Sequence, residues 1–192
     1  MYKTPFSKGY WQTASGEVKN LRVLAVAALF VGLHVVVSAF FVPLGENLRM
    51  YFSFFVTAVG SLIYGPVIAL MVGIASDILG FLIHPSGAFF PGYIITAMAS
   101  GLCYALFFYR TKLSILRVFL CKLCINLFIN IGLGSLWSSM LYGKGFYYYL
   151  AKSSVKNILL LPLEVLLLVL FLRALMPALC HLKLTTKESS FK

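Results

Sequence analysis

The residues of this chain that could do chemistry concentrate in one stretch, IASDILGFLIHPSGAFFPGY, at residues 74–93. Asp77 is the only formally charged residue between positions 50 and 109, and it is followed by His84 and Ser86. A serine nucleophile needs a base within hydrogen-bond reach and a group that orients the base, and these three residue types could supply both. The chain nevertheless has no GxSxG, no HExxH and no glycine-rich phosphate loop. We therefore expect a binding protein that is not an enzyme and cannot use ATP by itself.

The cysteines offer a second kind of chemistry. Cys121 and Cys124 have CxxC spacing, but no second pair and no histidine partner accompanies them. Small apolar packing is the favoured role for such cysteines, and metal or redox chemistry is the weaker alternative. We expect no metal and no cofactor in this chain.

The composition places these residues inside a membrane. Of the 192 residues, 61% are hydrophobic and 11% are charged, and the mean hydropathy is +0.95. A soluble domain carries about a quarter charged residues. Backbone groups in lipid must be hydrogen-bonded internally, which requires helices or a closed barrel. The apolar runs are long and continuous and do not alternate, so they favour helices.

We predict an all-α integral membrane protein with six transmembrane helices. Their expected limits are about 21–42, 48–64, 66–83, 91–109, 117–142 and 154–181. Residues 1–20 then form an N-terminal arm, residues 21–181 the membrane domain and residues 182–192 a tail.

An even number of crossings puts both termini on one side. If that side is cytoplasmic, it holds the first 22 residues, the 110–122 loop and the segment from Arg173, which contain four each of the 16 Lys and Arg residues. This excess fits the positive-inside rule. We therefore predict a multi-pass protein of the cell membrane with both termini cytoplasmic. The net charge of +11 is interpreted as a topology signal and not as a nucleic-acid interface.

Four cations fall on the expected outer side, namely Arg49, Lys144, Lys152 and Lys156. They belong to two loops that meet at the same end of the bundle. Two interpretations remain open and can coexist. The cations anchor lipid headgroups together with nearby tyrosines, or they form an electropositive mouth that collects an anionic solute.

Helical spacing turns polar residues of three expected helices towards the bundle interior. A carboxylate that faces lipid costs at least about 2.5–3.5 kcal/mol, so Asp77 should face the interior or a water-filled cavity. Asn126 is interpreted as a residue that joins helices by hydrogen bonds, and Glu164 as paired with a Lys, an Arg or a backbone donor. Asp77 and Asn130 are the candidates for ligand contact. The remaining polar or aromatic residues on these faces are Trp137, Lys156 and Asn157.

The segment 84–92 should form a shaped loop at the outer end of the bundle, because its prolines and glycines prevent the helix from continuing. It offers hydrogen-bond donors at Ser86 and at the amides of Gly87 and Ala88, and flat faces at Phe89, Phe90 and Tyr93. An aromatic heterocycle with hydrogen-bonding edges would suit this set. Asp77, about two turns below the loop, could accept from such an edge.

The first expected helix carries a pair of small residues, Ala28 and Gly32, four positions apart. Small residues at this spacing let another helix approach closely. The other helix either belongs to this chain's own bundle or to a separate membrane protein.

Four sequence blocks carry a family resemblance: NLRMYFSFF at 47–55, YGPVIALMVGIASDILGFLIHPSGAFFPGY at 64–93, SLWSSMLYGKGF at 135–146 and KNILLLPLEV at 156–165. The chain resembles a substrate-binding S component of the energy-coupling factor (ECF) vitamin transporters, specifically of the folate branch, from about Leu21 to Leu170. The Ala28-x-x-x-Gly32 pair resembles the AxxxA motif by which S components dock on their coupling protein. Where that branch often has a basic residue before the KN pair, this chain has Ser153, next to Lys152.

The resemblance implies a high-affinity folate-binding subunit that delivers folate with the transmembrane coupling protein EcfT and two cytoplasmic ATPases, EcfA and EcfA′. By the family's mechanism, the loaded protein would topple within the bilayer. Asp77 and Asn130 would read the edge of the pterin ring. The rings would be enclosed by Phe89, Phe90, Tyr93 and Trp137, the loop donors would be Ser86 and Gly87, and the carboxylates would be bound by Arg49 and Lys156.

Two other functions remain open at this point. One is an S component for another vitamin, although the outer cations argue against a cationic ligand. The other is a self-contained channel or transporter that uses Asp77 as a proton or ion site. A requirement for ATPase partners would separate the second from an S component.

Overall fold

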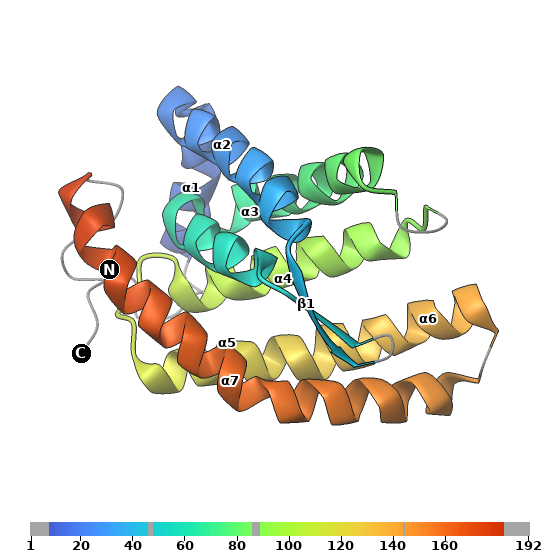
Figure 1. Ribbon diagram of the computed structural model, residues 1–192. Coiled ribbons are helices and arrows are strands. Elements are labelled where there is room, and N and C mark those ends of the chain that lie inside the picture. The colour runs from blue at the N-terminus through green and yellow to red at the C-terminus, as the bar shows by residue number, and fades with distance from the viewer. Residues whose placement is uncertain (1–7, 46–47, 86–88, 144, 183–192) are drawn as a thin grey trace.

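The computed structural model describes residues 8–45, 48–85, 89–143 and 145–182. Within these ranges the chain is helical except for one hairpin of two strands (Figure 1). The elements are α1 (Lys8–Gly16), the 3-10 helix η1 (Glu17–Lys19), α2 (Leu21–Ser38), β1 (Phe41–Gly45), β2 (Leu48–Tyr51), α3 (Ser53–Ile83), α4 (Gly92–Phe108), α5 (Ile115–Cys124), the π-helix η2 (Ile125–Leu133), α6 (Gly134–Tyr142) and α7 (Phe146–His181).

Four of these stretches are long and apolar enough to cross a membrane: Leu21–Ser38, Ser53–Ile83, Ile115–Tyr142 and Phe146–His181. The fifth apolar helix, Gly92–Phe108, is shorter. The prediction of an apolar helical membrane protein is therefore confirmed at the level of these spans.

The long helix α3 is interrupted at Gly65, whose φ and ψ are 77° and −177°. The following Pro66 has no N–H and disfavours a helical residue before it, and glycine alone adopts this positive φ without a steric penalty. Residues 53–64 and 66–83 are thus two helical segments, and the break lies where the sequence predicts the second and third crossings to meet. A Cβ atom at Gly65 would lie 3.0 Å from the ring of Tyr109, so the break also gives room to that ring.

The hairpin is a departure from the all-helical prediction. Strands β1 and β2 pair antiparallel, with Phe41 opposite Tyr51 and Pro43 opposite Arg49. The first helix therefore ends at Ser38 and not near 42, and the next begins at Ser53 and not at 48. Pro43 cannot donate an N–H to a helix interior, but it is tolerated in a strand that has a free edge.

Helix α7 begins at Phe146, eight residues earlier than predicted (at 154). The segment with Tyr148, Lys152 and Lys156 is consequently helical and not a loop. Its aromatic, alanine and lysine residues are compatible with a helix, and Pro162 lies inside the helix without ending it. The lysines are therefore held on a rigid element.

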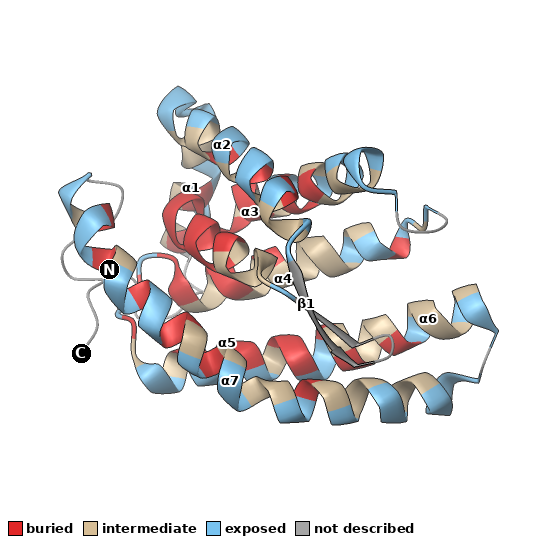
Figure 2. Cartoon of the chain, viewed as in Figure 1, coloured by how far each residue is buried: buried red, intermediate tan, exposed pale blue. Residues whose placement is uncertain are grey.

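The core consists of two main clusters that both use α3. Residues Ala58 and Leu62 of the first segment pack with Phe108, Val118 and Leu168 from α4, α5 and α7. The second cluster joins the second segment of α3, and Tyr64 at the end of the first, to α2; its members include Tyr64, Ile68, Ala69, Val72, Ala27 and Val31. The outer faces of α2 and α7 are exposed (Figure 2) and carry large apolar side chains, as expected of lipid-facing surfaces.

The contact between α3 and α4 is close because both helices present glycines there. A Cβ atom added to Gly73 would lie 2.9 Å from the backbone nitrogen of Met98, and one added to Gly101 would lie 3.0 Å from the carbonyl oxygen of Ala69. The hydroxyl of Ser61 donates to the carbonyl of Gly101 at 3.1 Å. Small residues with one polar contact are typical of helix pairs packed within a membrane.

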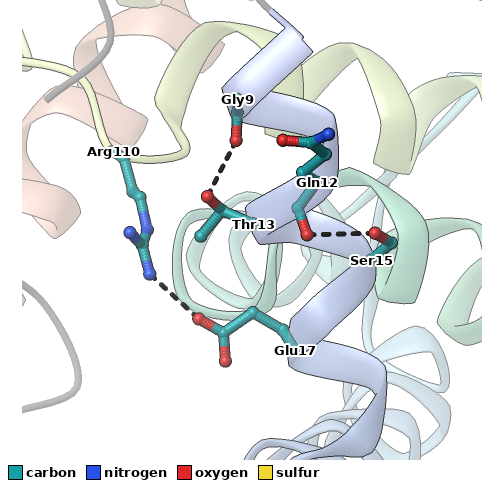
Figure 3. Close-up of polar contacts among 6 residues, drawn as sticks. All are labelled: Gly9, Gln12, Thr13, Ser15, Glu17 and Arg110. Carbon is teal, nitrogen blue, oxygen red and sulfur yellow. Dashed lines mark hydrogen bonds and ion pairs between the residues drawn. The ribbon is translucent and has the colours of Figure 1, made fainter.

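The described part of the N-terminal arm packs onto the bundle through α1. The hydroxyl of buried Tyr10 donates to the carbonyl oxygen of Ala105 at 3.0 Å, and its ring lies edge-on to Tyr109 at 5.6 Å. Burial, with a smaller contribution from Tyr109, raises the pKa of Tyr10, so its hydroxyl keeps the proton that it donates. At the end of the arm Glu17 pairs with Arg110 at 3.0 Å (Figure 3).

The elements sort to two ends of the molecule. Helix α1 and the C-terminal end of α7 lie at one end in Figure 1, and the α3–α4 and α6–α7 connections lie at the other. The predicted ligand residues around positions 77–93 and 130–156 belong to the second end.

Candidate ligand-binding site

An aromatic cluster forms where α4 begins against α6. The ring of Phe90 lies 5.5 Å from Trp137 and 6.0 Å from Tyr93, measured between ring centroids. The indole Nε1 of Trp137 donates to the Thr96 hydroxyl at 3.0 Å, and that hydroxyl donates to the carbonyl of Gly92 at 3.2 Å. Three of the four predicted ring-enclosing residues are thus brought together, and Thr96, which the sequence analysis missed, fixes the indole.

Gly92 makes this cluster possible. Pro91 precedes the first residue of α4, as the sequence predicts for the start of this helix. A Cβ atom at Gly92 would lie 2.7 Å from the Cδ2 atom of Trp137 and would also meet the ring of Phe90. The first turn of α4 therefore needs a residue without a side chain for the two rings to pack on it.

Asp77 lies half-buried on the second segment of α3. Tyr93 of α4 interacts electrostatically with the Asp77 carboxyl group and lies close to Ser138 of α6. The carboxyl group is therefore near the aromatic cluster, and three helices contribute polar groups to this region. That Asp77 faces the bundle interior or a water-filled cavity stays a prediction.

Phe89 is separated from the cluster. Its ring packs on Phe81 of α3, with centroids 5.1 Å apart, and the residue is 47% exposed. Ser86 and Gly87, the predicted loop donors, lie outside the described residues. The backbone of Arg49 is part of β2, but its side chain is also outside the described part of the chain.

An open groove with a volume of about 600 Å³ runs along the surface of the first turns of α7. Its lining residues are Tyr148, Ala151, Lys152, Val155, Lys156, Leu159 and Leu160. Lys156 is half-buried and Lys152 is exposed. The predicted cation Lys156 therefore lines this groove, and Lys152 lies beside it on the same helix.

A ladder of hydrogen bonds joins α5 and η2 to α7, and we call it the polar ladder. It consists of Lys122, Asn126, Asn130, Ser153, Asn157 and Glu164. Glu164 accepts from the Lys122 ammonium group at 3.0 Å and from the amide of Asn126 at 3.1 Å. The interpretations of Asn126 as a helix-joining residue and of Glu164 as a paired carboxylate are both confirmed.

Lys122 had been counted with the cytoplasmic loop, and that assignment is wrong. The loop ends where α5 begins at Ile115, and Lys122 is a buried residue of that helix with its ammonium group on Glu164 and over the ring of Phe54. A signal was present in the sequence, because Lys122, Asn126 and Asn130 are spaced by four residues. This spacing extends the polar face of the fifth crossing by one turn.

Ala28 and Gly32 are exposed on α2, on the flank of the face that buries Ala27, Val31 and Val35. A Cβ atom at Gly32 would have no atom of the described chain within 4 Å. In this structure the pair therefore does not pack against the described helices of its own bundle, and the surface is open to another helix.

Comparisons with known proteins agree with this architecture. Residues 22–172 match the family described as the substrate-specific component of ECF transporters. The chain is 31% identical over 147 residues to the folate transporter FolT of Clostridium novyi, covering 77% of this chain and 86% of that protein. It is 32% identical over 153 residues to FolT of Leuconostoc mesenteroides, covering 76% and 82%. Among solved structures, the crystal structure of FolT bound with folic acid aligns with a TM-score of 0.67 and 27% identity, covering 74% of this chain and 86% of that one.

Proposed function

This chain belongs to the substrate-specific components of ECF transporters, and on that premise we propose that it binds folate with high affinity as the S component of an ECF-type importer. Two relatives over most of the chain are folate transporters, and a related fold has been solved with folic acid. The family is one of transport subunits and not of enzymes. ATP hydrolysis is accordingly assigned to partner subunits.

The observation that supports the folate assignment is the open groove on α7, which Lys152 and Lys156 line. Folate ends in a glutamate with two carboxylates, and two ammonium groups on one rigid helix complement that end. A volume of about 600 Å³ lies within the usual range for a small-molecule site. The aromatic cluster of Phe90, Tyr93 and Trp137 supplies flat faces for the pterin at the same end of the molecule.

The roles of individual residues follow this division. Asp77 and Asn130 read the hydrogen-bonding edge of the pterin, and Phe90, Tyr93 and Trp137 enclose its rings. Phe89 packs on Phe81 apart from the aromatic cluster, and its contact with the rings of the ligand stays a prediction. Lys156 binds a carboxylate together with Arg49, and the loop donors are Ser86 and Gly87.

The orientation in the membrane is part of the proposal. Counting the two segments of α3 separately gives six crossings, with both termini in the cytoplasm and the ligand site near the extracellular end. Support comes from the positions of α1 and the end of α7 at one end of the bundle, and of the predicted ligand residues at the other (Figure 1). The excess of cations in the arm and tail agrees with this orientation.

Binding is tested with the purified protein in detergent. Folate should quench the fluorescence of Trp137, followed in a Trp11→Phe background, with saturation at one ligand per protein, and thiamine should not. Asp77→Asn should weaken folate binding at least about tenfold, because it removes one partner of a charge-assisted contact. Absence of folate binding by a monodisperse sample would contradict the proposed ligand. Unchanged affinity of Asp77→Asn would remove only Asp77 from the site.

The partners are the transmembrane coupling protein EcfT and the ATPases EcfA and EcfA′, and the docking surface is the face of α2 with Ala28 and Gly32. Gly32→Trp should abolish folate uptake while leaving folate binding intact, because an indole prevents close approach of a helix. Leu166→Trp on the exposed face of α7 is the matched control and should keep uptake. Uptake by Gly32→Trp would show that α2 is not the docking surface.

A further inference from the structure

In the polar ladder, the donor and the acceptor of each hydrogen bond can be assigned one after another, starting from Lys122. An ammonium group can only donate hydrogen bonds, and an ionised carboxylate can only accept them. Glu164 therefore accepts at its Oε2 atom from Lys122 at 3.0 Å. The same oxygen faces Asn126 at 3.1 Å, so the amide atom that Asn126 turns towards it must be the nitrogen.

A second contact fixes the Asn126 amide independently. Its Nδ2 atom also lies 3.3 Å from the carbonyl oxygen of Asn157, which is an acceptor in every protonation state. Asn126 is buried, so no water competes for these bonds. With the nitrogen held by two acceptors, the oxygen of Asn126 faces Asn130.

Asn130 is consequently fixed as well. Its Nδ2 donates to the Oδ1 of Asn126 at 2.9 Å, and its backbone carbonyl accepts from the Ser153 hydroxyl at 3.1 Å. Within the described part of the chain, its Oδ1 atom accepts no hydrogen bond. Asn130 is only partly buried.

We propose that Asn126 is a positioning residue that holds the Asn130 amide with its oxygen towards the ligand, so that the site selects a ring that presents a hydrogen-bond donor there. This inference rests on the proposed function and deepens it. The pterin of folate has such an edge in its 2-amino group and neighbouring N–H. A ring with an oxygen in place of that amino group would meet the Asn130 oxygen with another acceptor.

The test compares folate with 2-desamino-2-oxofolate, in which a carbonyl oxygen replaces the 2-amino group. The wild type should prefer folate by at least about tenfold, since an unmade hydrogen bond to a buried partner costs about 1–3 kcal/mol. Asn126→Leu removes the oxygen that accepts the hydrogen bond from the Asn130 side chain. The Asn130 amide can then rotate and donate to the oxo analogue. The preference should narrow at least about fivefold, mainly through tighter binding of the analogue.

The matched control is Ser139→Ala, which removes a hydroxyl of α6 that bonds only within its own helix, to the carbonyl of Leu136. It should keep the preference of the wild type. If Asn126→Leu weakens both ligands by the same factor, Asn126 contributes packing alone and the inference is overturned. Asn126→Ala gives the same comparison if the leucine variant aggregates.

A ligand-free measurement separates this inference from the folate assignment. The thermal midpoints of Asn126→Leu, Asn130→Leu and the double variant form a cycle that reports the coupling between the two amides. The decrease in thermal midpoint of the double variant should be smaller than the sum of the decreases of the two single variants. Strict additivity would overturn the inference even if folate binds, whereas a wild type that binds neither folate nor its analogue contradicts the proposed function instead.

Discussion

The ammonium group of Lys122 lies 3.0 Å from a carboxylate oxygen of Glu164, and the two side chains are only 3% and 12% exposed. The pair joins α5 to α7 at one end of the polar ladder, where Asn126 also donates to Glu164. Removing either charge should destabilise the fold strongly, because the other charge is then buried without a partner.

Lys122→Met should lower the free energy of unfolding by about 3–5 kcal/mol, since it leaves Glu164 buried without the ammonium group. The double variant Lys122→Met/Glu164→Gln should recover most of the loss, because the glutamine oxygen still accepts from Asn126 and no charge remains. Thermal midpoints in detergent measure both effects. A double variant no more stable than the single one would show that the pair is not the source of the loss.

Gly73→Ala should destabilise the protein, because its Cβ would lie 2.9 Å from backbone atoms of α4, which cannot move as a side chain can. A cost of about 1–3 kcal/mol is typical of such overpacking. Gly80→Ala is the matched control on the same helix, since no atom lies within 4 Å of the added methyl group. Its thermal midpoint should equal or exceed that of the wild type. Equal midpoints for the two variants would mean that α3 and α4 separate easily at Gly73.

Thr96→Val should weaken folate binding by about three- to tenfold while changing stability little, because Trp137 loses the acceptor that fixes its indole. Titration of folate against Trp137 fluorescence measures the effect. Thr57→Val removes a hydroxyl that bonds only to its own helix, at the carbonyl of Ser53, and should bind folate normally. An unaltered affinity of Thr96→Val would exclude the indole orientation as a determinant of binding.

Lys156→Met and Lys152→Met should each weaken folate binding at least about tenfold if they bind the carboxylates of the glutamate tail. Pteroate, which lacks that glutamate, distinguishes a charge effect from a packing effect. Its affinity should change little in either variant. Lys112→Met, an exposed residue between α4 and α5, is the control and should bind both ligands as the wild type does. Equal losses for folate and pteroate would contradict the assignment of the tail to α7.

The sequence predicts much of the fold because its helix ends coincide with residues that cannot continue a helix. Gly65 and Pro66 divide α3 where two crossings were expected to meet, and Pro91 precedes α4 as predicted. The hairpin of residues 41–51 was missed because a short apolar strand and a helix end look alike in an apolar sequence. The sequence does not predict the early start of α7, because the tyrosines and lysines of residues 146–156 also suit a loop at the membrane surface.

The candidate site was predicted less completely, since its geometry depends on partners distant in sequence. Residue type and helical face select Asp77, Asn130 and Trp137 as candidate ligand residues. They do not predict that the side-chain nitrogen of Asn130 donates to Asn126, or that the indole of Trp137 donates to Thr96. The side chain of Phe89 turns to Phe81 although its neighbour Phe90 joins the cluster, because successive loop residues point in different directions.

The buried pair of Lys122 and Glu164 also has a consequence for membrane insertion during synthesis, because its two residues are made at different times. The ribosome completes α5 well before it reaches Glu164, so the nascent chain must enter the bilayer with an ammonium group that has no counter-charge. A lysine costs about 2.5–3.5 kcal/mol at the centre of a helix on insertion scales and less towards its ends. Lys122 lies in the first third of the span Ile115–Tyr142, and the apolar residues that follow must offset its smaller cost. The last helix to be synthesised neutralises the charge, so a nascent chain released before α7 would retain an unpaired lysine within the membrane.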